Sequence, residues 1–177
     1  MIRQSAAPAL GERVEAAWQV LGTVPDPEVP AVSVRDLGIV REVIDHDEGL
    51  EIVLTPTYSG CPATEVIEQD VLKAIDAAGL GPARVTLRRA PAWTTDWISA
   101  EGLAKMLAYG IAPPGPARSD GAVPITFIGR KRDTASLACP RCGSHHTERL
   151  AAFGSTACKA IYRCIACKEP FEHFKPI

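Results

Sequence analysis

The sequence predicts an α+β fold, in which a small three-stranded mixed sheet with helices is followed by a metal-binding β-hairpin domain. Helical and alternating apolar patterns follow one another in the order α-β-β-α-β-α in the N-terminal part of the chain. A stretch rich in proline and glycine then leads to a tail with two Cys-x-x-Cys pairs. We therefore expect a medium-sized domain and a small one, joined by a linker.

The first helix is expected over residues 11–21, because the apolar residues there recur at helical spacing. Three prolines within residues 25–30 come next, and they exclude both helix and strand pairing. We therefore expect an extended loop that holds the carboxylates of Asp26 and Glu28.

A hairpin and a crossover should build the sheet. Residues 41–45 read as a strand, 47–49 as a turn, and 50–55 as a second strand with alternating apolar residues. The third strand is expected over 83–89. If it runs parallel to the second, the helix between them makes a right-handed crossover, and helices then cover one face of the sheet.

The second helix is expected to begin at Cys61 and Pro62, because proline is favoured at the first helical position. A short final helix should cover 100–109. These elements define four regions: a mobile leader over 1–11, an α/β domain over 12–109, a linker over 110–133 and a ribbon over 134–177.

Composition limits the classes of function. The chain has 177 residues, 46% of them hydrophobic, which suffices for a core, and no apolar run reaches the length of a membrane helix. Residues 1–109 hold 9 basic and 16 acidic residues, whereas 134–177 hold 6 and 3. The basic excess of the tail is too small to favour nucleic-acid binding. The N-terminus lacks the pattern of a signal peptide, so we expect a cytoplasmic protein whose six cysteines serve metal or thiol chemistry.

The two Cys-x-x-Cys pairs predict a metal ribbon. Each pair forms a tight turn, and two such turns can supply four thiolates in the tetrahedron that Zn²⁺ prefers. Iron or an iron–sulfur cluster would accept the same donors. The alternative, two disulfides, would require an exported protein. The predicted ligands are Cys139, Cys142, Cys164 and Cys167.

Other ribbon residues are weaker candidates. His145 and His146 follow the first turn, but four cysteines make them unnecessary as ligands. Cys158 is interpreted as a buried hairpin residue, with a fifth ligand or exchange thiol as the alternative.

Cys61 is the most interesting residue outside the ribbon. At a helix start, free N–H groups and the helix dipole lower the pKa of a thiol. The competing interpretation is a small buried apolar residue. Asp26 and Glu28 could assist such a thiolate or a metal, or simply shape their loop. Trp93 and Trp97 are interpreted either as a partner-binding surface or as a lid packed on the sheet.

Several segments resemble known proteins. Residues 26–28, 36–40 and 55–62 resemble the domain of SufT-like iron–sulfur assembly factors. From about residue 12 to the C-terminus, the chain is similar to the family of accessory D subunits of phenylacetyl-CoA 1,2-epoxidase systems. The further segments that carry this similarity are 93–98, 109–114, 153–159 and 164–175.

The resemblance implies an accessory or maturation factor in aerobic phenylacetate degradation, without catalytic activity of its own. It implies that Cys61 is a transient ligand for iron or a cluster and that the ribbon is structural, with the oxygenase or reductase components as partners. The supporting residues would be Asp26, Glu28, Thr57 and Ser59. Which component is the client and whether the chain self-associates stay open.

Two other classes of protein compete with this interpretation. A thiol enzyme would use Cys61 as nucleophile, but the sequence offers no obvious base. A non-catalytic zinc-ribbon binding protein is the third, and nucleic acid is disfavoured as its partner by the acidic body of the chain.

Overall fold

The computed structural model describes residues 10–58, 60, 62–115 and 137–177. The chain forms two compact units that meet in sequence between Trp93 and Thr94. This boundary precedes the expected linker, because the final helix of the α-β-β-α-β-α series belongs to the second unit. Each unit is therefore considered by itself.

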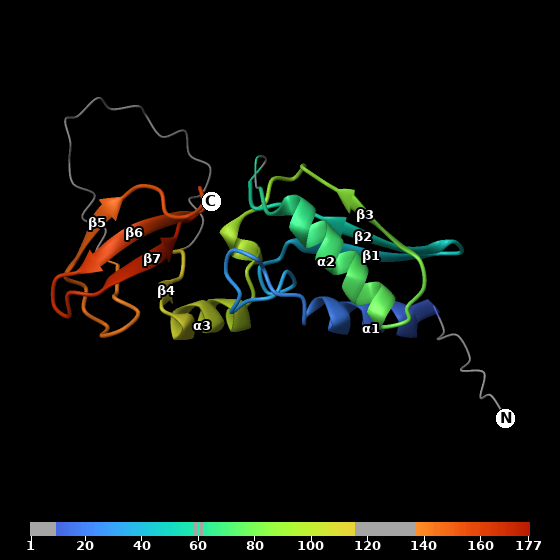
Figure 1. Ribbon diagram of the computed structural model, residues 1–177, viewed down its shortest axis with the longest axis horizontal. Helices are drawn as coiled ribbons and strands as arrows, with labels where there is room; N and C mark the ends of the chain where they lie inside the picture. The colour runs from blue at the N-terminus through green and yellow to red at the C-terminus, as the bar shows by residue number, and fades with distance from the viewer. Residues whose placement is uncertain (1–9, 59, 61, 116–136) are drawn as a thin grey trace. The chain divides into compact units, whose positions relative to one another are not determined.

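The first unit contains the predicted three-stranded mixed sheet (Figure 1). Its strands lie in the order β1-β2-β3, with β1 antiparallel and β3 parallel to the central strand. The elements are α1 (Leu10–Leu21), β1 (Val40–His46), β2 (Gly49–Leu54), α2 (Thr64–Ala77) and β3 (Ala83–Leu87).

The core lies on the face of the sheet that α1 and α2 cover. Alternate residues of β2 point toward the helices and are fully buried there, since strand side chains alternate between faces. Asp45 of β1 shares this face, and Arg13 of α1 pairs with it at 2.9 Å. Arg13 also donates to the carbonyl of Leu80, so one side chain ties α1 both to the sheet and to the loop before β3.

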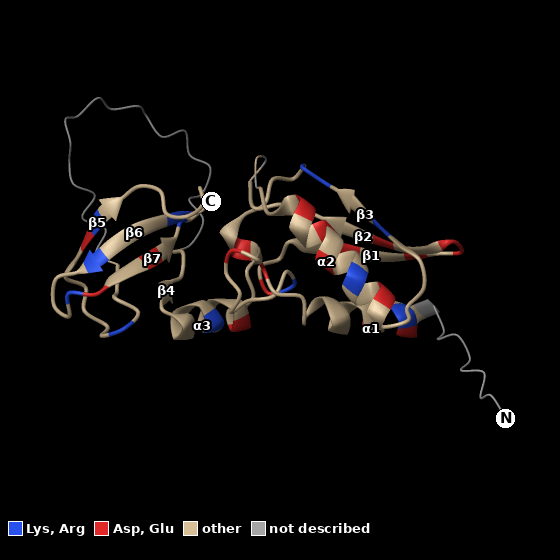
Figure 2. Cartoon of the chain, viewed as in Figure 1, with Lys and Arg blue, Asp and Glu red and all other residues tan. Residues whose placement is uncertain are grey.

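The opposite face of the sheet carries a polar cluster around Glu51. Its carboxylate accepts hydrogen bonds from Thr86 at 2.8 Å and Arg84 at 2.5 Å, and lies 2.9 Å from the ring of His46. Beside this cluster, Arg88 holds both oxygens of Glu42. Figure 2 shows acidic residues at the β1–β2 turn and basic residues on and beyond β3. This face carries a charge network in place of a second helical layer.

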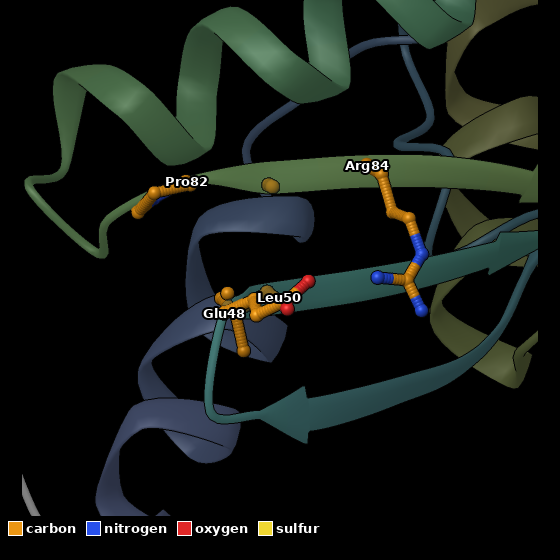
Figure 3. Close-up of a pocket in the computed structure, with 6 residues that line it drawn as sticks. Glu48, Leu50, Pro82 and Arg84 are labelled. Carbon is orange, nitrogen blue, oxygen red and sulfur yellow. The ribbon is translucent and has the colours of Figure 1, made fainter.

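The hairpin end of the sheet contains a shallow hollow of about 130 Å³ (Figure 3). Gly49 lines it with a φ of 144°, and a Cβ there would meet the Pro82 carbonyl oxygen at 2.3 Å. Leu50 donates its N–H to that same oxygen. This close backbone approach beside the hollow requires glycine at position 49.

The second helix corrects one expectation. It begins at Thr64, with Ala63 as its N-cap and no side-chain cap, so Cys61 is not the N-cap and Pro62 is not the first helical residue. Pro62 and Ala63 instead form a turn that leads into the helix. The preference of proline for the first helical position therefore placed the start of α2 two residues too early.

The second unit is a four-stranded sheet preceded by helices. The predicted hairpin between the two cysteine pairs is present as β5 and β6, and β7 pairs antiparallel with β6 on its other side. Strand β4 comes from the stretch expected to be linker and pairs in parallel with β7. The elements are η1 (Thr95–Trp97), α3 (Ala100–Tyr109), β4 (Ile111–Ala112), β5 (Thr147–Ala151), β6 (Lys159–Cys164) and β7 (Pro170–Phe174).

None of the helices in the described ranges is both long and apolar enough to span a membrane.

Candidate metal centre

The two Cys-x-x-Cys turns have the same backbone hydrogen bonds. In the first, the N–H of Gly143 donates to the carbonyl of Cys139, whose own N–H donates to the carbonyl of Ser144. In the second, the N–H of Lys168 donates to the carbonyl of Cys164 at 2.9 Å. The Cys164 N–H donates in turn to Glu169 at 3.0 Å. The turns are therefore two copies of one local structure.

These turns bring the four predicted sulfurs together. All four Sγ atoms lie within 4.8 Å of one another, and the four residues are called the cysteine cluster below. Cys139 and Cys167 are 3.8 Å apart, and Cys142 and Cys164 are 3.5 Å apart. Zn–S bonds of about 2.3 Å place tetrahedral sulfurs about 3.8 Å apart, so the spacing fits a metal such as zinc.

The four cysteines differ in their surroundings. Cys139 and Cys164 are 2% and 0% exposed, and they belong to the hydrophobic cluster of the ribbon that Tyr162 and Phe171 also build. Cys167 is partly buried against that cluster, whereas Cys142 is exposed. The first cysteine of each pair therefore doubles as a core residue.

Hydrogen bonding prepares one thiol for deprotonation. The backbone N–H of Cys167 points at the sulfur of Cys164 at 3.5 Å, and this contact lowers the pKa of Cys164 to about 6. A lowered pKa favours the thiolate, which is the form that binds metal. The four-cysteine cluster is thus consistent in spacing and chemistry with a bound metal ion such as zinc.

Cys158 lies outside this cluster of described residues. It is buried and lies 3.1 Å from the hydroxyl of Thr156, as expected for a hairpin residue. His145 and His146 are exposed and are not part of the cluster either.

The structure also reveals a residue that the sequence did not single out. His173 on β7 is 6% exposed, and neither ring nitrogen has a hydrogen-bond partner among the described residues. Burial lowers its pKa to about 4, so the ring is neutral at ordinary pH. The sequence could have indicated that His173 is buried only through the alternating pattern of residues 170–174, a strand that was not expected.

The candidate thiolate of the first unit, Cys61, and its supporting residue Ser59 lie outside the described residues. The loop residue Asp26 is buried, and its Oδ1 accepts N–H bonds from Glu28 at 2.9 Å and Val29 at 2.8 Å. This carboxylate therefore shapes its own loop, which was one of the two interpretations of it. Thr57, which precedes Cys61 in the same loop sequence, is buried.

The tryptophan pair is divided between the two units. Trp93 is 3% exposed, and its indole N–H donates to the carbonyl of Leu37 at 2.9 Å. It is therefore packed in the first unit, and its burial does not fit the first of its two interpretations, a partner-binding surface. Trp97 is half-buried in the second unit. Between them, Thr94 and Thr95 hold the carbonyl of Ile177, which the sequence did not indicate.

Comparison with known proteins places the two parts of the chain separately. Residues 4–87 match the family of iron–sulfur cluster assembly proteins, and residues 126–175 match the PaaD zinc beta ribbon domain. The chain is 43% identical over 165 residues to an Escherichia coli protein described as the D subunit of a putative 1,2-phenylacetyl-CoA epoxidase. That similarity covers 93% of this chain and 94% of the relative. The chain belongs to the PaaD family.

Other relatives match about half of this PaaD-family chain. An Fe-S protein maturation auxiliary factor from Porphyromonas gingivalis is 33% identical over 90 residues, which are 50% of this chain and 85% of that protein. The crystal structure of a domain of unknown function from Bacillus anthracis superposes with a TM-score of 0.51 and 25% identity. It covers 55% of this chain and 93% of that one, which supports the assignment of the fold.

Proposed function

We propose that this protein is an accessory factor that helps to assemble an iron or iron–sulfur centre of a phenylacetyl-CoA epoxidase. One observation carries the proposal. The chain is similar over 93% of its length to the D subunit of an epoxidase, residues 4–87 match the iron–sulfur cluster assembly family, and about half of the chain is similar to an Fe-S protein maturation factor. A maturation domain kept within an epoxidase component is best explained if the epoxidase itself is the client.

Cys61 would supply the chemistry of the first unit. A thiolate is a soft ligand that binds iron and cluster intermediates, and such iron is cargo in this role. Asp26 would support this site indirectly, because its carboxylate accepts two backbone N–H bonds and so fixes its own loop. Glu28, Thr57 and Ser59 would be the further supporting residues. Each of these roles rests on the sequence motifs and on the family, since Cys61 lies outside the described residues.

The ribbon would serve as a structural and docking module. Cys139, Cys142, Cys164 and Cys167 would hold the metal, most simply zinc, which cross-links the two turns and orders the small sheet. A rigid ribbon could then contact the oxygenase or the reductase component. Self-association of the chain is compatible with the same role.

The test separates maturation from catalysis by the time at which the protein is needed. Oxygenase and reductase are purified from cells that contain this protein and from cells that lack it, and their iron content and turnover are measured. We expect the first pair to epoxidise phenylacetyl-CoA without added protein and the second pair to be poor in metal. If adding the protein to fully metallated components raises turnover many-fold, it is instead a working subunit of the oxygenase.

A further inference from the structure

The cysteine cluster is asymmetric, although its two turns share one backbone structure. Cys139 and Cys164 are packed in the ribbon core with Tyr162 and Phe171. Cys167 is partly buried against the same core, and only Cys142 among the four is exposed. A reagent in solvent therefore has access to one sulfur of the cluster before the others.

The side of the cluster around Cys142 is open for a reason that lies in the sheet. Cys164 is the last residue of β6, and Cys167 precedes β7, so the second turn is bounded by paired strands. The first turn is followed by Ser144 and the exposed His145 and His146 before β5 begins at Thr147. Cys142 is therefore followed by exposed residues rather than by a paired strand, and it is itself exposed.

We propose that Cys142 is the reactive ligand of the ribbon, through which small soft electrophiles modify the cluster and cause loss of its metal. A thiolate that binds zinc keeps nucleophilic character, and its rate of attack depends on access. The four thiolates are chemically alike, so their exposure to solvent should decide which of them reacts first. The inference requires that the ribbon holds a metal and does not depend on the assembly role.

The chemical step balances with a simple alkylating probe. The thiolate sulfur of Cys142 attacks the carbon that bears iodine in iodoacetamide, so that a C–S bond forms and the C–I bond breaks. Iodide leaves with the electron pair of that bond. The product is an uncharged thioether, which is a much poorer zinc ligand than a thiolate. The remaining three cysteines then hold the metal less tightly.

The experiment uses the full chain loaded with zinc and a limiting amount of iodoacetamide. Peptide mass spectrometry follows the alkylation of each cysteine, and a chromogenic chelator follows the release of zinc. We expect Cys142 to be labelled roughly tenfold faster than Cys139 or Cys164, at the same rate as zinc release. Labelling of Cys61 or Cys158 is mapped in the same digest and should not follow zinc release.

Two histidine variants provide matched controls, because three cysteines and one histidine also form a zinc site. Cys142→His should keep zinc and slow its electrophile-driven release roughly tenfold, whereas Cys167→His should leave the release rate close to that of the parent. If Cys142→His fails to bind zinc, the labelling order in the parent decides alone. Faster labelling of Cys139 or Cys164, equal protection by both variants, or a parent without metal would overturn the proposal.

Discussion

Gly143 and Lys168 occupy the same position in the two cysteine turns, and both backbones are left-handed, with φ of 72° and 69°. Each N–H donates to the carbonyl of the first cysteine of its pair. Glycine adopts this conformation without steric cost, whereas a lysine side chain opposes it by about 1 kcal/mol. The second turn therefore carries a local strain that the first turn lacks.

Replacing Lys168 with glycine should relieve that strain. We expect Lys168→Gly to stabilise the zinc-loaded ribbon by about 1 kcal/mol, because the turn keeps its hydrogen bonds and loses an unfavourable Cβ. Thermal unfolding of the loaded protein measures the effect. The control Lys168→Ala removes the charge and keeps the Cβ, so it should not stabilise. A lower melting temperature for Lys168→Gly at unchanged zinc content would contradict the assignment of strain.

Removing one cysteine ligand should disturb the ribbon and leave the first unit folded. Cys142→Ser is expected to bind far less zinc and to loosen the ribbon, because three thiolates hold the metal weakly and apo ribbons lose their order. The first unit has its own sheet and core, so its NMR signals should stay unchanged. Metal analysis and amide NMR spectra check both parts. Full zinc content in this variant would remove Cys142 from the ligand set.

Gly49 should be intolerant of any side chain. Gly49→Ala is expected to destabilise the first unit by about 2–4 kcal/mol, because its φ of 144° and the Pro82 carbonyl both oppose a Cβ. Gly79→Ala is the matched control, since Gly79 has a φ of 67° and nothing within 4 Å of the added atom. That variant should cost only about 1 kcal/mol. Equal losses in urea unfolding would show that the Pro82 contact relaxes freely.

Glu51 should make the first unit sensitive to acid. Hydrogen bonds from Thr86, His46 and Arg84 lower its pKa from 4.5 to about 2 in the folded state. The stability that this group contributes is complete above pH 4.5 and is lost as the pH falls toward 2, because the unfolded chain takes up the proton first. Glu51→Gln should flatten the stability profile in that window. If Glu51→Gln leaves the fall in unfolding free energy below pH 4.5 unchanged, the hydrogen bonds to Glu51 add nothing to stability.

Cys61 should be needed for function and not for folding. Cys61→Ala is expected to unfold at close to the parent temperature, while growth on phenylacetate fails or the co-expressed oxygenase contains less iron. The reason is the soft thiolate that alanine lacks. Cys158→Ala, which removes a cysteine outside the cluster, is the control and should support growth if it folds. Normal growth with Cys61→Ala would leave a scaffold role.

Most of the helices and strands, and the meeting of the four cysteines, were predictable because they have strong local patterns. The final helix was predicted over 100–109 and is present as α3, since Ser99 caps it and Gly110 ends it in a left-handed conformation. The mixed sheet followed from a turn signal at the hairpin and from a helix between β2 and β3. The four cysteines met as predicted because the spacing within each pair fixes a turn.

The remaining features depend on contacts between distant residues. Strand β4 has two residues and therefore no periodicity, and it is defined only by its pairing with β7. The burial of Trp93 depends on the Leu37 carbonyl, which lies far away in the sequence. Cys142 and Cys167 hold equivalent positions in two pairs that look alike as sequence, yet Cys142 is exposed and Cys167 is partly buried.

The pairing of Ile111 and Ala112 with β7 occupies one edge of that strand. An unpaired strand edge is a template on which further chains can add. If the chain were cut after Ala112, β7 would offer such an edge, and the shortened ribbon should associate into oligomers more readily. Ile111 and Ala112 thus cover one edge of β7, and a shortened ribbon keeps that edge paired only if it begins before them.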